Sequence, residues 1–126
     1  PVKAAKKARR VEARTVYLLF YQNAVALRRR PDRGLLAGLW EYPNELASES
    51  GGLRQWGLSA PVLERAGTGI HIFSHVEWRM TGYALEVSGT GPGDFLWADG
   101  PELAEHAVPS AFARYHEEAR RLLKEG

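Results

Sequence analysis

The chain has 126 residues, enough for one compact domain, and 44% of them are apolar, so a sizeable core can form. It contains no cysteine, which excludes disulfides, thiol catalysis and thiolate metal sites and fits a reducing compartment. No apolar run approaches the roughly 20 residues of a membrane-spanning helix, so we expect no membrane association. The start, Pro1–Lys7, has neither an initiator methionine nor the apolar core of a signal peptide, and we expect it to continue a longer protein.

The net charge of +2 hides an asymmetry along the chain. Residues 1–33 carry ten lysines and arginines against two acidic residues, whereas residues 34–126 carry seven against thirteen. Basic segments favour polyanions because contacts with phosphates release counterions. Basic tails are also often only solvated, so the charge alone leaves nucleic-acid binding and a plain solvated surface equally open.

Strand patterns dominate the first third of the chain. Residues 1–13 are basic and have too little apolar surface to pack, which predicts a linker or arm. Thr15–Tyr21 is β-branched and aromatic with both faces apolar, as in a central strand. Gln22-Asn23 predicts a turn, and Val25–Arg30 predicts a second strand that ends in three arginines. These arginines are open to two interpretations, phosphate contacts or a solvated strand end.

The next segments are less regular. Pro31–Gly34 predicts a loop, and Leu35–Tyr42 is an apolar segment that the following proline stops. Residues 44–57 are ambiguous, because a short helix could begin near Ser48 but two adjacent glycines weaken it. Further strands and bends are expected at Val62–Ala66, Gly67–Gly69, Ile70–Phe73, Trp78–Val87, Ser88–Gly93 and Phe95–Ala98.

Two helices are expected near the end of the chain. Pro101–His106 fits one or two helical turns, with Asp99 as a cap. Ser110–Lys124 has the strongest helical pattern, because its apolar residues recur at a spacing of three to four, and Ser110 is its expected N-cap. We interpret the apolar stripe of this second helix as core packing.

The segment from Ile70 to Trp78 concentrates the candidate chemistry. His71, Phe73 and His75 alternate with β-branched and hydroxyl residues, which predicts an extended segment with polar tips. An aromatic ring, a hydroxyl and an imidazole can stack on a base and bind its edge; a strand with merely solvated histidines is the other interpretation. Two strand residues four apart are separated by about 13 Å, so one zinc ion could not bind both histidines without a sharp bend in the chain.

Three sequence motifs follow one another along the chain. They are Leu35-Leu36-Ala37-Gly38-Leu39-Trp40-Glu41-Tyr42-Pro43, then Phe73-Ser74-His75, then the closing amphipathic helix. Over nearly the whole chain this order resembles the C-terminal domain of MutY-type adenine DNA glycosylases. The resemblance implies an α+β fold, an α/β/α sandwich in which a Nudix-like mixed β-sheet is packed between helices and ends in a C-terminal amphipathic helix. It also implies a basic interdomain connector at 1–13 and a Nudix-like 8-oxoguanine-recognition domain at 14–126.

The resemblance implies a role in base excision repair of DNA. Members of that family remove adenine mispaired with 8-oxoguanine, and their catalytic carboxylates and 4Fe-4S cluster lie in the N-terminal domain. For this fragment we therefore expect no catalytic residue, no metal and no cofactor. The expected partners are double-stranded DNA that contains 8-oxoguanine and the N-terminal glycosylase domain of the same chain. The expected location is the cytoplasm, at the bacterial nucleoid, if the source is prokaryotic.

The same resemblance assigns the expected DNA contacts. Ser74 would accept a hydrogen bond from the N7–H that 8-oxoguanine has and guanine lacks. Phe73 would stack on a base or shape the loop, and His75 would reach a base edge or a phosphate. An ordinary core aromatic and a solvated surface histidine are the other interpretations of these two residues. The expected phosphate contacts are basic residues near the start of the chain, namely Lys3, Lys6, Lys7, Arg9 and Arg10.

Two other functions compete with this interpretation. A catalytic Nudix hydrolase of oxidised nucleotides would need clustered glutamates on an Arg-Glu-x-x-Glu-Glu helix to hold magnesium. In this chain Arg54 is followed by Gln55 and Trp56, so we expect the scaffold without the phosphohydrolase chemistry. The other alternative is a protein-interaction module that does not contact the lesion.

Overall fold

The computed structural model describes residues 9–125, with all of their side chains except those of residues 62, 63 and 125. Its strands are β1 Arg10–Tyr21, β2 Ala24–Arg29, β3 Trp40–Glu41, β4 Asn44–Leu46, β5 Val62–Ile72, β6 Val76–Glu86 and β7 Leu96–Ala98. Its helices are α1 Gly52–Gln55, α2 Gly100–Glu105, the 3₁₀ turn η1 Ser110–Phe112 and α3 Ala113–Glu125. No helix among the described residues is long and apolar enough to cross a membrane.

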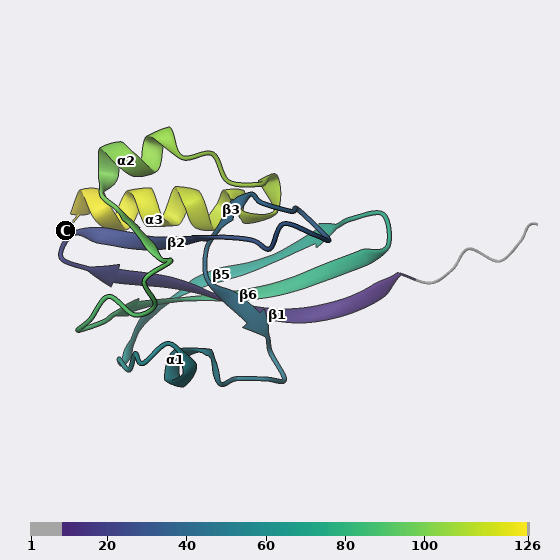
Figure 1. Ribbon diagram of the computed structural model, residues 1–126, viewed down its shortest axis with the longest axis horizontal. Coiled ribbons are helices and arrows are strands. Elements are labelled where there is room, and N and C mark those ends of the chain that lie inside the picture. The colour runs from purple at the N-terminus through teal and green to yellow at the C-terminus, as the bar shows by residue number, and fades with distance from the viewer. Residues whose placement is uncertain (1–8, 126) are drawn as a thin grey trace, which may run out of the picture.

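The strands of residues 9–125 form one mixed sheet. Its order is β3-β2-β1-β6-β5, while β4 pairs with β1 and β7 pairs with β2. β1 runs parallel to β6 and antiparallel to β2 and β4. Figure 1 shows α2 and α3 on one side of the sheet and α1 on the other. The predicted mixed sheet between helices, closed by a C-terminal helix, is therefore confirmed.

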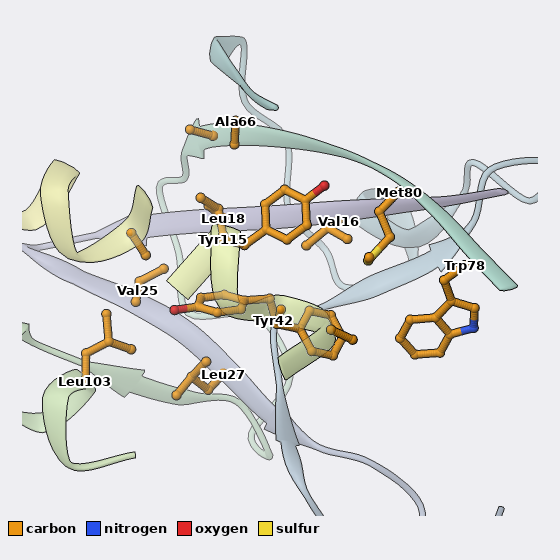
Figure 2. Packing of buried hydrophobic residues seen from close by; sticks show 14 of the residues in the cluster. Val16, Leu18, Val25, Leu27, Tyr42, Ala66, Trp78, Met80, Leu103 and Tyr115 are labelled. Carbon is orange, nitrogen blue, oxygen red and sulfur yellow. The ribbon is translucent and has the colours of Figure 1, made fainter. Parts of the chain in front are cut away.

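β1 lies in the middle of the sheet because both of its faces are apolar. Val16 and Leu18 belong to the core on the α3 side, and Tyr17 and Leu19 belong to the core on the α1 side. Val16, Leu18 and Leu19 are completely buried. Figure 2 shows Tyr115 of α3 packed over the first two of these residues. Full burial of one such side chain contributes about 1.5–3 kcal/mol, so β1 stabilises both cores.

β5 differs from its prediction in one respect. The sequence suggested two short strands separated by a bend at Gly67–Gly69, but β5 is one continuous strand, Val62–Ile72. Its pairing with β6 shifts register between Arg65 and Gly67, where Gly67 has a φ of +97°. A β-bulge with glycine in the left-handed region bends a strand without ending it, so the glycines mark a bulge and not a break.

The start of β1 and the whole of β4 were also missed. β1 begins at Arg10, so the expectation of an unpacked arm over 1–13 is wrong for residues 10–13, which pair with β6. This segment lacks an apolar face of its own, and it is held by hydrogen bonds of the parallel ladder. The short β4 follows Pro43 and was part of the ambiguous segment 44–57; it pairs with β1 from Arg14 to Val16.

The two C-terminal helices begin differently from each other. The cap at Asp99 is confirmed, because its carboxylate accepts from the Glu102 N–H at 2.9 Å and the Glu102 side chain returns a bond to the Asp99 N–H. The cap at Ser110 is wrong, since the first turn is 3₁₀, its N-cap is Pro109 and no side-chain cap bond forms there. The tighter turn places Ser110 inside the helical segment instead of before it.

A histidine on α3 connects the helix to the sheet. The His116 Nδ1 atom lies 2.9 Å from the Tyr42 hydroxyl, just after β3. Burial lowers the pKa of His116 below 6.5, and the nearby Arg120 lowers it further. Between that lowered pKa and 6.5 the unfolded chain binds more protons than the folded one. The free energy of unfolding therefore falls as the pH drops through this window.

Replacing this histidine gives a test of that linkage. In His116→Gln, we expect the free energy of unfolding to lose most of its change between about pH 7.5 and 5.5, because the titrating group is gone. Urea unfolding at a series of pH values measures the change. Glu12 and Glu118 have pKa values lowered below 4.5, so both proteins should still lose stability in stronger acid. If the wild type and His116→Gln lost the same stability between about pH 7.5 and 5.5, His116 would not be the titrating group.

Candidate nucleic-acid interface

Ser74 and His75 form the two-residue turn between β5 and β6. The Phe73 N–H donates to the Val76 carbonyl at 2.7 Å, which closes the hairpin. The His75 carbonyl accepts from the Arg10 N–H at 3.2 Å, which connects the turn to the start of β1. The extended alternation predicted through this segment stops at Phe73 because the chain reverses here. The strands on either side of this turn, β5 and β6, pair antiparallel from Ile72 with Glu77 onward.

Phe73 is half-buried and packs against the end of the core. Its ring centroid lies 5.0 Å from that of Trp78, nearly edge-on, and 4.7 Å from that of His71. Trp78 is only 1% exposed, so Phe73 is held against a rigid part of the core. Of the two roles expected for Phe73, shaping the loop agrees with this packing. Its contact with a base stays a prediction.

Ser74 and His75 point away from the core and are exposed. Neither side chain forms a hydrogen bond with another residue of 9–125, so the Ser74 hydroxyl is available as both donor and acceptor. A cavity of about 530 Å³ opens beside them, which is within the range of small-ligand sites. It is lined by Arg10, Leu35, Ile72, Phe73, Ser74, His75 and Val76. We call this cavity the turn cavity.

The turn cavity brings together three segments that are distant in sequence. Arg10 comes from β1, Leu35 from the loop between β2 and β3, and the remainder from the β5–β6 turn. The motif around the turn and the basic start were predicted as parts of one site. Leu35 was missed as a site residue, because nothing in its local pattern distinguishes a cavity wall from a core leucine.

The end of the sheet beside the turn cavity carries more positive than negative charge. Arg9 and Arg79 share Glu77, at 3.5 and 2.7 Å, and Arg10 and Arg14 share Glu12, both at 2.8 Å. The hydrogen bond from Arg79 is the main cause that lowers the pKa of Glu77. Burial raises the pKa of Glu12, but hydrogen bonds from Arg10 and Arg14 outweigh it and lower the pKa overall.

These pairings leave four guanidinium groups against two ionised carboxylates among the described residues of this end. The excess positive charge is suited to phosphates. Arg9 and Arg10, both predicted as phosphate contacts, lie at this end of the sheet, and each has a carboxylate partner. The other predicted phosphate contacts, Lys3, Lys6 and Lys7, lie outside the described residues.

The segment that would hold magnesium in a Nudix hydrolase has a different use here. The Glu45 carboxylate accepts from the N–H groups of Gly51 and Gly52 at 3.1 and 2.9 Å, and from the Tyr17 hydroxyl. Burial raises the pKa of Tyr17, and its bond to Glu45 raises it further. Within residues 9–125 no three His, Cys, Asp or Glu side chains gather as metal ligands. The residues present at α1 do not fit a magnesium site.

A family model for the NUDIX domain matches residues 15–118. The chain belongs to the NUDIX domain family. The chain is 33% identical to adenine DNA glycosylase of Rattus norvegicus, over 77% of this chain and 22% of that protein. It is 30% identical to adenine DNA glycosylase of Mus musculus, over 100% of this chain and 29% of that protein. The NUDIX domain described here therefore spans less than a third of these curated relatives.

Solved structures show the same relationship. The C-terminal domain of mouse MUTYH, in its complex with human PCNA, is 28% identical to this NUDIX domain, with a TM-score of 0.60 and coverage of 84% of this chain and 88% of that one. The E. coli ORF135 protein shares the fold, with a TM-score of 0.71 at 17% identity, over 90% of this chain and 91% of that one. The predicted Nudix-like fold and the resemblance to adenine DNA glycosylases are confirmed.

Proposed function

We propose that this NUDIX domain is the non-catalytic lesion-recognition domain of an adenine DNA glycosylase and that it reads 8-oxoguanine opposite adenine in duplex DNA. One observation carries the proposal. The exposed Ser74 hydroxyl has no partner within residues 9–125, and it lies on a cavity at the end of a hairpin turn whose flanks are fixed by backbone hydrogen bonds. The similarity to rat and mouse adenine DNA glycosylases supports the same conclusion.

The chemistry of the lesion explains why a hydroxyl suits this position. Guanine presents N7 as an acceptor, whereas 8-oxoguanine carries a proton on N7 and a carbonyl at C8. Ser74 accepts from N7–H in the lesion, but with guanine the same geometry brings two acceptors together unless the hydroxyl rotates. A contact of this kind discriminates between bases by about 1–3 kcal/mol. Phe73 packs against Trp78 and so fixes the position of the turn. His75 contacts a base edge or a phosphate.

The basic residues supply attraction that is independent of sequence. Arg9 and Arg10 lie beside the turn cavity, and Lys3, Lys6 and Lys7 precede them in the sequence. Cleavage of the glycosidic bond and the 4Fe-4S cluster belong to the N-terminal glycosylase domain of the longer protein. The task of this chain is to bind, orient and discriminate.

A second candidate function is a protein-interaction module. The specific observation that favours it is the complex of the mouse MUTYH C-terminal domain with human PCNA, a relative that is 28% identical to this chain. Phosphohydrolysis has no such support, since the carboxylates near α1 do not form a metal site. A comparison of duplexes with and without the lesion separates lesion recognition from protein interaction.

Ser74→Ala tests the proposed function. With a short duplex we expect the wild-type chain to bind 8-oxoguanine opposite adenine more tightly than guanine opposite adenine. Ser74→Ala should lower that preference by about tenfold, because the methyl group cannot accept from N7–H. Amide NMR titration at high protein concentration measures both affinities even when they are weak.

Ser88→Ala is the matched control, since Ser88 is also exposed but lies at the other end of β6. It should leave the preference unchanged. A wild-type chain without preference would refute lesion recognition and favour the protein-interaction module. If Ser74→Ala kept the preference for 8-oxoguanine, Ser74 would not be the residue that recognises the lesion.

A further inference from the structure

Glu41, the last residue of β3, is a buried carboxylate. It is 2% exposed, and it accepts from Arg28 Nε at 2.9 Å, Arg30 Nη1 at 2.7 Å and Asn44 Nδ2 at 2.8 Å. Arg28 is its direct neighbour across the β2–β3 pair. The interpretation of these arginines as a solvated strand end therefore fails for Arg28 and Arg30, which are partly buried.

Arg30 connects Glu41 to both sides of the turn cavity. Its Nε atom donates to the Leu35 carbonyl at 2.8 Å, while its Nη1 atom is bound to Glu41. The same guanidinium lies 5.2 Å from the ring centroid of Trp78. Trp78 in turn supports Phe73 at the turn. One arginine thus fixes the backbone of one cavity wall and the aromatic support of the other.

Asn44 provides a second connection from Glu41 to the same tryptophan. While its amide nitrogen donates to Glu41, its Oδ1 atom accepts from Arg14 Nε at 2.9 Å. The Arg14 guanidinium lies 5.0 Å from the ring centroid of Trp78. Both cations near this ring are therefore oriented by Glu41, one directly and one through Asn44. Arg14 is also bound to Glu12, so Glu41 supports the position of Trp78 mainly through Arg30.

We propose that Glu41 is the positioning residue of the turn cavity, holding the Leu35 wall through Arg30 and the Phe73-Ser74-His75 wall through Trp78. This inference rests on the proposed function for its consequence in DNA binding. Stability alone does not explain a buried carboxylate at this position, because a buried ion pair often stabilises a protein no more than apolar residues of the same volume. A planar fork of donors does, however, fix directions that apolar contacts leave free.

The first test needs no DNA. Glu41→Gln keeps the shape of the side chain but removes the negative charge that binds Arg28 and Arg30. We expect the Trp78 indole resonance and the amide resonances of residues 73–75 to shift or broaden in two-dimensional NMR spectra. The control is Glu45→Gln, a change at a buried carboxylate that binds Gly51, Gly52 and Tyr17 and, among the described residues, no arginine. It should leave those resonances in place.

The second test uses the lesion preference defined above. Glu41→Gln should lower the preference for 8-oxoguanine over guanine by about fivefold or more, and Glu45→Gln should not. In the Ser74→Ala background, Glu41→Gln should cause no further loss of preference, while its effect on thermal stability should persist. A purely structural role would lower stability and leave the ratio of the two affinities unchanged.

The outcomes separate the two proposals. If the wild-type chain has no lesion preference, the proposed function fails, and the NMR shifts alone decide whether Glu41 positions the turn. If the wild type has the preference and Glu41→Gln keeps it with unchanged turn resonances, the positioning role is refuted. Should Glu41→Gln fail to fold, Arg30→Lys replaces it in both tests, because it keeps the charge opposite Glu41 but loses the fork to Leu35.

Discussion

Gly82→Ala is expected to lower the free energy of unfolding by about 3 kcal/mol, because the added methyl group has no room. A Cβ on Gly82 would lie 2.4 Å from Tyr115 Cε1 and 3.2 Å from Ala66 Cβ. Tyr115 is completely buried, and its hydroxyl donates to the Gly67 carbonyl at 3.1 Å, so the ring cannot move aside without losing that bond. Either α3 or β6 must shift.

Urea unfolding of the two proteins measures the loss. Gly93→Ala is the matched control, since no atom lies within 4 Å of a Cβ built there and the residue is exposed. It should change the free energy of unfolding by less than about 0.5 kcal/mol. An effect of that small size at Gly82 would mean that α3 does not press on β6 as the structure has it.

Trp78→Ala is expected to cost about 3–5 kcal/mol, as other deletions of large buried aromatic side chains do. The ring is in edge contact with Phe73 at 5.0 Å and Phe112 at 5.8 Å. Figure 2 shows its nitrogen turned away from the other labelled residues. That nitrogen is buried and has no hydrogen-bond partner among the described residues, which slightly reduces the loss.

Trp97→Ala serves as the comparison for the tryptophan. Trp97 is only half-buried, and its indole nitrogen bonds to the Thr90 carbonyl at 3.0 Å. We expect its removal to cost less than half as much. Differential scanning calorimetry ranks the two variants, and an equal loss at both positions would argue that Trp78 is not the centre of the packing near the turn.

Local patterns were sufficient where one element carries its own signal. The run at Thr15–Tyr21, apolar on both faces, predicted the central strand, and Asp99 just before Pro101–His106 predicted a helix cap. The two strands that meet at Ser74-His75 were found for the same reason, since both are rich in β-branched and aromatic residues. In each case the decisive residues lie within one turn or one strand of each other.

Long-range pairing decided what the sequence could not predict. Two of the four residues 10–13 are charged, Arg10 and Glu12, yet the segment forms a strand because it pairs with β6. Glu41 and Arg30 are eleven positions apart, and Asn44 and Arg14 are thirty apart, so their shared network has no local pattern. The turn motif was visible in the sequence, whereas the residues that hold it in place were not.

The parallel ladder between β1 and β6 has a consequence for alignment. Pairing runs from Arg10 with Val76 to Phe20 with Glu86. At residues 16–19 both faces of β1 are apolar, so a slip by one position would cost little hydrophobic burial there. At the outer end the charged Arg10, Glu12 and Arg14 alternate with Val11 and Ala13, and a slip would exchange these sets. The polar end of β1 therefore fixes the register of the β1–β6 pair. In a shifted register Arg10 would lose its backbone hydrogen bond to the His75 carbonyl.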